Sequence, residues 1–255
     1  NNVAGGYNAL TANTTGSHNI GIGYNALKDN VGGTSNAAIG YGSLASNTSG
    51  QCNTGVGSSS LNANINGQRN VGIGNSSLRD NSSGNYNTAV GKSSGQSITT
   101  GDDNLTIGHQ AGILLTTGNY NTILGSDSDP SASSASNQTV IGYNVTGQAD
   151  NSVVLGNADV TAIYMAQDKG ATVHAAGADL SGSTGLILEN DETITNSTDG
   201  TVLINGTVAG GTGSAAGVFT SNGDQDVTLQ TGNSTTGSIT ITDGANGNIA
   251  ITPNG

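Results

Sequence analysis

A fixed period of 17 residues is the feature of this sequence that most constrains its fold. Nine glycines, each four residues after an Asn or Gln, follow one another at eight intervals of 17 residues. These anchor glycines are Gly6, Gly23, Gly40, Gly57, Gly74, Gly91, Gly108, Gly125 and Gly142. One more unit ends at Gly156 after a step of 14 residues. A fixed internal period is typical of solenoids, in which each repeat forms one turn.

Several other positions obey the same period and form columns of like residues. The asparagines of the anchor unit are Asn2, Asn19, Asn36, Asn53, Asn70, Asn87, Asn104 and Asn121, and Gln138 breaks the series. Four residues after the anchor stand Leu10, Leu27, Leu44, Leu61 and Leu78, followed by Gly95 and Gly112. Directly before the anchor stand Ile22, Ile39, Val56, Ile73, Val90, Ile107, Leu124 and Ile141. The residues around each anchor alternate in the manner of a β-strand.

These columns predict an all-β fold, a parallel β-roll or β-solenoid with one repeat per turn. We expect two short strands in each turn, separated by corners rich in Gly, Asn and Ser. The column before the anchor and the leucine column are predicted to face each other across a thin interior, at the strand spacing of about 4.8 Å. The asparagine column is predicted to form a ladder of side-chain amides that satisfies backbone groups at the corners, although turn formation alone would also explain it.

A chain of this kind has too little core to be stable alone. Only 33% of the residues are hydrophobic and 3% aromatic. Ordering a residue costs about 1 kcal/mol or more, and two or three apolar side chains per turn cannot offset that for 17 residues. We therefore expect a homo-oligomer. A column of residues that are small for most of the array, two positions before the anchor (Gly21, Ala38, Gly55, Gly72, Ala89, Thr106), is predicted to let another chain approach closely.

The period stops after Gly156, and the sequence predicts three regions. Residues 1–156 are the repeats, residues 157–185 form a junction, and residues 186–255 are an acidic segment of short alternating strands. Strands such as Ser238–Thr242 and Asn248–Thr252 have too few apolar residues to stand alone. We expect three chains to complete their core as a β-prism or triple β-helix.

Charge and residue usage exclude several classes of function. The net charge is −12 with only five Lys and Arg, which disfavours nucleic-acid binding. No apolar run approaches the ~18 residues of a membrane helix, so we expect no membrane insertion. His18, His109 and His174 are far apart in sequence, and Asp102 and Asp103 lie in no calcium-binding motif. We therefore expect no enzymatic activity, no metal and no cofactor.

One column varies in chemistry from repeat to repeat, which is typical of a solvent-facing corner. It contains His18, Cys52, Arg69, Tyr86, Asp103 and Tyr120. We expect any contact with a cell-surface glycan or protein receptor to involve His18, Arg69, Tyr86 and Tyr120. A second column holds Tyr7, Tyr24, Tyr41 and Tyr143, which either pack at a corner or bind sugar.

The units Asn137-Gln-Thr-Val-Ile-Gly142 and Asn151-Ser-Val-Val-Leu-Gly156 resemble the head repeat of trimeric autotransporter adhesins. That resemblance covers residues 2–156 and implies a left-handed parallel β-roll assembled as a homotrimer. Residues 151–176, and tail motifs such as Thr228-Leu-Gln-Thr-Gly-Asn, resemble tail-fibre proteins of marine bacteriophages. Residues 1–255 depart from the adhesin pattern in that they include no segment that resembles its anchor domain or heptad stalk.

Three functions are compatible with the sequence. The first is a structural and adhesive segment of an extracellular viral tail fibre that takes part in host attachment. In that case we expect most of residues 1–255 to be shaft. The second is the head region of a trimeric adhesin on a bacterial surface. The third is an ice-binding solenoid, suggested by the single Thr-x-Thr unit of Thr240 and Thr242.

Overall fold

The computed structural model describes residues 1–164. The predicted acidic segment of residues 186–255 and most of the predicted junction lie outside the described residues. Within residues 1–164, no helix is long and apolar enough to cross a membrane.

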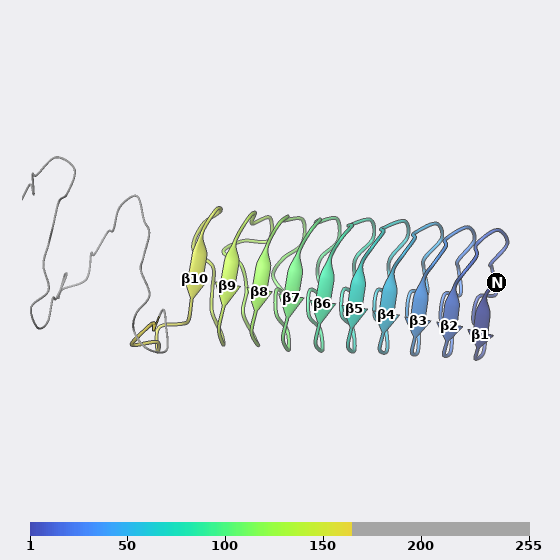
Figure 1. Ribbon diagram of the computed structural model, residues 1–255, viewed down its shortest axis with the longest axis horizontal. Helices are drawn as coiled ribbons and strands as arrows, with labels where there is room; N and C mark the ends of the chain where they lie inside the picture. Colours follow the sequence, from blue (N-terminus) through green and yellow to red (C-terminus); the bar gives the residue numbers. More distant parts are fainter. Residues whose placement is uncertain (165–255) are drawn as a thin grey trace, which may run out of the picture. The chain divides into compact units, whose positions relative to one another are not determined.

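Ten strands of three residues each form one parallel sheet, ordered along the chain from β1 to β10 (Figure 1). The strands are β1 (Val3–Gly5), β2 (Ile20–Ile22), β3 (Ala37–Ile39), β4 (Thr54–Val56), β5 (Val71–Ile73), β6 (Thr88–Val90), β7 (Leu105–Ile107), β8 (Thr122–Leu124), β9 (Thr139–Ile141) and β10 (Val153–Leu155). The predicted parallel β-solenoid of about nine turns, with about 17 residues per turn, is confirmed.

The 17-residue period sets the register of the sheet. Ile73 of β5 pairs with Val90 of β6, so residues of one column lie directly beside each other. The last step keeps this register although it is shorter, because Leu155 of β10 still pairs with Ile141 of β9. The connection from β9 to β10 is therefore three residues shorter than the others, and the strand register is unchanged.

Each turn contains one regular strand rather than the two predicted. In most turns four residues outside the strand have positive φ: the anchor glycine and three others, one of which belongs to the leucine column, with φ between 48° and 54°. Single backbone hydrogen bonds still join these bends to the next turn. The N–H of Leu44 donates to the carbonyl of Ser60 at 3.0 Å, and the N–H of Thr48 donates to that of Ile65 at 2.9 Å. The turns therefore stack without a second regular strand.

The predicted orientation of the strands is wrong. The middle residue of each strand from β2 to β9 is buried, whereas the residues on either side point outward. Ile73, predicted to be inside, is 41% exposed. The leucine column lies inside as predicted, and it fills the space behind the strand. A Cβ built at Gly55 would touch Leu44 Cδ1 at 3.5 Å and would collide with Ser43 Oγ at 2.5 Å, so a larger side chain has no room there.

The small column is therefore an internal feature, contrary to its predicted role in close approach by another chain. Ala38 and Ala89 are fully buried. A Cβ built at Gly21 would lie 3.3 Å from Leu10 Cγ of the same turn. These residues are small because they pack against the chain's own leucines.

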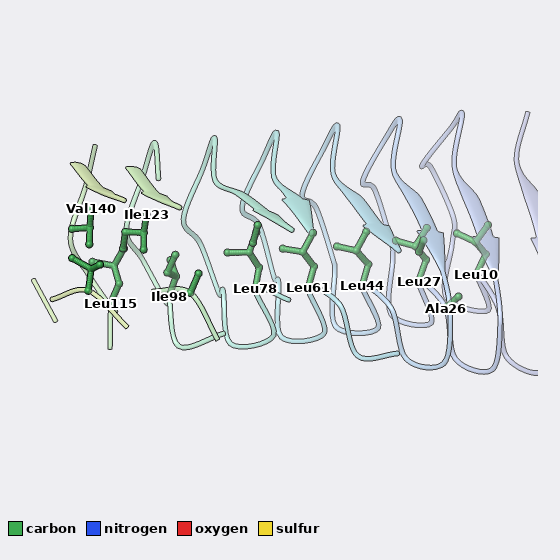
Figure 2. Packing of buried hydrophobic residues seen from close by; sticks show 14 residues of the cluster. Leu10, Ala26, Leu27, Leu44, Leu61, Leu78, Ile98, Leu115, Ile123 and Val140 are labelled. Atoms are coloured by element: carbon green, nitrogen blue, oxygen red, sulfur yellow. The ribbon is translucent and has the colours of Figure 1, made fainter. Parts of the chain in front are cut away.

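The source of the interior side chains changes partway along the rod. Up to Leu78 the apolar filling comes from the leucine column (Figure 2). Beyond it, glycine replaces leucine at Gly95 and Gly112, and the filling comes from Ile98 and Leu115 together with the strand residues Ile123 and Val140. A Cβ built at Gly95 would stand 2.9 Å from Thr106 Oγ1, so the larger strand residues occupy the space that leucine has left.

The asparagine column of the anchor unit is buried and linked from turn to turn. Asn70 is representative. Its Nδ2 donates to the carbonyl of Gly84 at 2.8 Å and to Oδ1 of Asn53 at 3.1 Å. Its own Oδ1 accepts the backbone N–H of Asn87 at 2.9 Å. The ladder thus satisfies one backbone donor and one backbone acceptor per turn.

A second buried asparagine ladder was not predicted. It consists of Asn30, Asn47, Asn64 and Asn81, seven residues after the anchors, and begins at the half-buried Asn13. Asn64 Nδ2 donates to Asn47 Oδ1 at 2.7 Å, and Asn81 Nδ2 donates to Asn64 Oδ1 at 2.9 Å. Ile98 takes the next position and cannot donate. Oδ1 of Asn81 is consequently the one buried side-chain polar atom without a partner among residues 1–164.

The anchor glycines stand at a backbone conformation that other residues avoid. Those from Gly6 to Gly142 have φ between 130° and 140°. A Cβ at Gly74 would also collide with the carbonyl oxygen of Gly91 in the next turn. Both the torsion and the close stacking require glycine, which explains why this column is invariant along the chain.

Candidate interaction surfaces

The outward face of the sheet is a continuous apolar and neutral surface. The first outward column consists of Val3, Ile20, Ala37, Thr54, Val71, Thr88, Leu105, Thr122, Thr139 and Val153. The second consists of Gly5, Ile22, Ile39, Val56, Ile73, Val90, Ile107, Leu124, Ile141 and Leu155. The isoleucines of the second column are 37–43% exposed. Nine strand spacings make this face about 43 Å long. Large exposed apolar patches mark interaction sites.

The variable column forms a second exposed surface, as predicted. His18, Arg69, Tyr86 and Tyr120 are all exposed and occupy the same position of the repeat in four different turns. Each has a positive φ between 56° and 62°. His18 Nδ1 lies 3.1 Å from Ser17 Oγ. Arg69 contacts Tyr86 one turn away, whereas His18 lies three turns from Arg69. The four residues therefore share a column without forming one pocket.

Three tyrosines form a stacked ladder beside the outward face. The rings of Tyr7 and Tyr24 have centroids 5.3 Å apart, and those of Tyr24 and Tyr41 have centroids 5.2 Å apart with an interplanar angle of 5°. All three side chains remain exposed. The three tyrosine rings therefore pack against one another and still contact solvent. The ladder ends at the next turn, where Ser58 stands in place of tyrosine.

Two ion pairs in the described repeats each join residues that are adjacent in sequence. Lys28 Nζ lies 3.0 Å from Asp29 Oδ1, and Arg79 Nε lies 2.8 Å from Asp80 Oδ1. Burial raises the pKa of Asp129 above its ordinary value, opposed by backbone hydrogen bonds. Within residues 1–164, no group of three or more His, Cys, Asp or Glu is arranged to hold a metal ion.

The asparagines predicted to form a ladder contribute to the structure of the interior and do not reach the surface. Asn19, Asn36, Asn53, Asn70, Asn87, Asn104 and Asn121 are buried in the interior. Sequence reasoning missed the outward isoleucine face because it placed those residues inside. In the leucine column, Leu78 is followed by Gly95, and from Thr106 onward the middle residues of the strands become larger. This compensation between two columns is the signal in the sequence that could have shown that the middle residues of the strands face inward.

The repeat and its geometry define the chain as a parallel β-solenoid. No protein-family model matches it, and no curated protein matches its sequence. Its function is therefore argued from the surfaces described above.

Proposed function

We propose that this chain is a structural and adhesive segment of a homotrimeric fibre, in which the outward face of the sheet packs against two further copies. The observation that carries the proposal is that the second outward column, Ile22 to Leu155, is exposed or half-buried along the nine strands from β2 to β10. Burying these side chains would supply the apolar contacts that the narrow, asparagine-rich interior lacks. At about 25 cal/mol per Å² of apolar surface, an interface along the whole rod is a substantial stabilisation.

The biological setting that we propose is an extracellular viral tail fibre involved in attachment to the host cell. The resemblance of residues 151–176 to bacteriophage tail fibres supports this setting. The head region of a bacterial trimeric adhesin is the alternative, supported by the repeat-like units up to Gly156. The sequence that flanks this segment in its gene distinguishes them, since a virion-attachment domain is expected in one case and a membrane anchor in the other.

Sedimentation equilibrium tests the trimer. The purified chain should have three times the chain mass of 24.9 kDa. Ile73→Asp places a charge at the centre of the proposed interface, and it should produce a folded monomer because Ile73 is exposed in the single chain. Arg69→Asp, in the variable column of the same turn, is the matched control and should remain trimeric. A monomeric wild type, or a trimeric Ile73→Asp variant, would contradict the proposal.

The outward face also gives a reason to test ice binding. In the first outward column, threonine recurs at every second turn at Thr54, Thr88 and Thr122, and Thr139 follows one turn later. A free face would be needed for that function. A monomer with thermal hysteresis would favour ice binding, and a trimer without it would favour the fibre.

A further inference from the structure

Three members of the variable column have side chains that their backbone conformation disfavours. Arg69, Tyr86 and Tyr120 have φ of 56°, 59° and 62°. In this left-handed region Gly, Asn and Asp are tolerated far better than other residues. The neighbouring column with positive φ uses small or polar residues, such as Asn25, Gly42 and Ser76. Positive φ also occurs in the leucine column, where the side chains pack in the core, whereas Arg69, Tyr86 and Tyr120 hold large side chains in solvent. A strained backbone that presents an exposed side chain is a candidate functional position.

Backbone hydrogen bonds fix the spacing of these side chains. The N–H of Tyr86 donates to Gln68 O at 3.0 Å, and the N–H of Tyr120 donates to Asp102 O at 3.1 Å. Asp103 is bonded in the same way to the turn before it. Consecutive members are therefore one strand spacing apart, so Tyr86 and Tyr120 are separated by about 9.6 Å. Asp103 occupies the layer between them.

One face of Tyr86 already carries a cation. The guanidinium carbon of Arg69 lies 5.3 Å from the ring centroid, and Arg69 Nη1 donates to Tyr86 Oη at 2.9 Å. Arg69 belongs to the preceding turn, so the opposite face of the ring is directed toward the layer of Asp103. Tyr86 is 51% exposed and Tyr120 63% exposed. A ligand can therefore reach the layer between the two tyrosines from solvent.

The layer between the rings has the groups that a cation requires. Along the column, the backbone of each tyrosine lies about 4.8 Å from that of Asp103, a spacing compatible with the ~6 Å range of cation–π contacts to both rings. The exposed carboxylate of Asp103 has no hydrogen bond or ion pair among residues 1–164. Neighbouring Asp102 adds negative charge while its Oδ1 accepts bonds from Asn85.

We propose that Tyr86, Asp103 and Tyr120 form a slot that binds the guanidinium group of an arginine side chain on a partner protein. A guanidinium is planar and stacks on aromatic rings, and its N–H groups pair with a carboxylate. Quaternary ammonium groups could stack on the rings but have no N–H to donate to Asp103. The net charge of −12 also attracts cationic partners.

This inference deepens the proposed attachment role and depends on it for its biological use. A single slot of this kind is weak because it is open to water. Three slots in a trimer, engaging several arginines of one receptor, would raise the overall affinity through effective concentration. Contact with a host protein would then occur along the shaft as well as at any tip.

The binding test uses the purified chain with ¹³C-labelled tyrosine and NMR titration. The probe is the peptide acetyl-Gly-Arg-Gly-amide, and its matched control has citrulline, which is neutral and of similar shape, in place of arginine. The ring signals of Tyr86 and Tyr120 should shift saturably at millimolar arginine peptide, whereas those of Tyr7 and Tyr143 should not. Citrulline peptide should bind about tenfold more weakly.

Two variants locate the site without threatening the fold. Asn suits a positive φ at least as well as the residues it replaces, so Tyr120→Asn and Asp103→Asn should fold. Tyr120→Asn should weaken binding about three- to fivefold and Asp103→Asn about tenfold, whereas Tyr143→Asn should change nothing. Unchanged affinity in both slot variants, or equal affinity for the citrulline peptide, would overturn the proposal. Equal or tighter binding of acetylcholine would instead assign the slot to a quaternary ammonium group.

Sedimentation of the same samples separates this proposal from that of the fibre. A monomer that binds the arginine peptide through Tyr120 would retain the slot and refute the trimer. A trimer that binds no arginine peptide would retain the fibre and refute the slot.

Discussion

Removal of one rung of the first asparagine ladder is the sharpest test of how the interior is held together. Asn70→Ala deletes the side chain that bonds Gly84 and Asn87. The N–H of Asn87 then loses its partner inside the rod, whereas the carbonyl of Gly84 keeps the hydrogen bond that Asn81 Nδ2 donates to it at 3.1 Å. An unsatisfied buried polar group costs about 1–3 kcal/mol, so this one group predicts a loss of about 1–3 kcal/mol. Asn53 Oδ1 still accepts the N–H of residue 70, which keeps the estimate to one group.

The assay is chemical denaturation followed by far-ultraviolet circular dichroism at one fixed protein concentration. Asn75→Ala is the matched control. Asn75 is exposed, and the hydrogen bond of its side chain is with its neighbour Ser76 at 3.2 Å. Its replacement should change the free energy of unfolding by no more than about 0.5 kcal/mol. If the two variants lost the same stability, the ladder would contribute nothing beyond turn formation, and the reasoning would be refuted.

Three further perturbations address other parts of the rod. Gly74→Ala should lower Tm strongly, because it adds backbone strain of about 1–3 kcal/mol and a collision with the next turn. Gly32→Ala should be tolerated, because Gly32 has an ordinary φ and the nearest atom to its added Cβ is 3.3 Å away. Equal Tm values for the two variants would contradict this. Gly95→Leu should destabilise the fold by about 1–3 kcal/mol through overpacking, and adding Thr106→Gly should recover part of that loss. If a double-mutant cycle showed no coupling between the two positions, the strand residues would not occupy the space that leucine fills in the earlier turns. Because folding raises the pKa of Asp129, the contribution of this group to stability is present below the ordinary pKa of Asp and is lost as pH rises through the raised pKa. Asp129→Asn should therefore raise Tm at pH 7, and the gain in Tm should shrink on acidification. A difference in Tm that does not depend on pH would contradict the raised pKa.

The sequence predicted the coil of the chain but not which side of the strand faces inward. The 17-residue interval between anchors such as Gly57 and Gly74 is enough to establish one repeat per turn. Alternation around Ile73 establishes two faces, and hydrophobicity alone favours placing isoleucine inside. The cross-section of a 17-residue turn is too narrow for that, because the leucine column already fills it. Steric competition of this kind depends on the closed shape of the turn, which no single strand reveals.

The surfaces were predicted in part. The variability of the column containing Arg69 and Tyr86 correctly indicated exposure, since a buried column would have had to keep one size. Its positive φ was not foreseen, because residues such as Tyr and Arg carry no preference for that conformation. The second asparagine ladder had the same period as the first, and Asn47, Asn64 and Asn81 could have been found by extending the comparison to every position of the repeat.

The change of filling between Leu78 and Ile98 has a consequence for how the rod unfolds. A solenoid behaves as a chain of units coupled to their nearest neighbours, and its cooperativity is set by the weakest coupling. At this junction the second ladder ends, and Oδ1 of Asn81 is left without a partner. We therefore expect two cooperative blocks that meet between Leu78 and Ile98, so that one block opens under mechanical load or partial denaturation while the other remains intact.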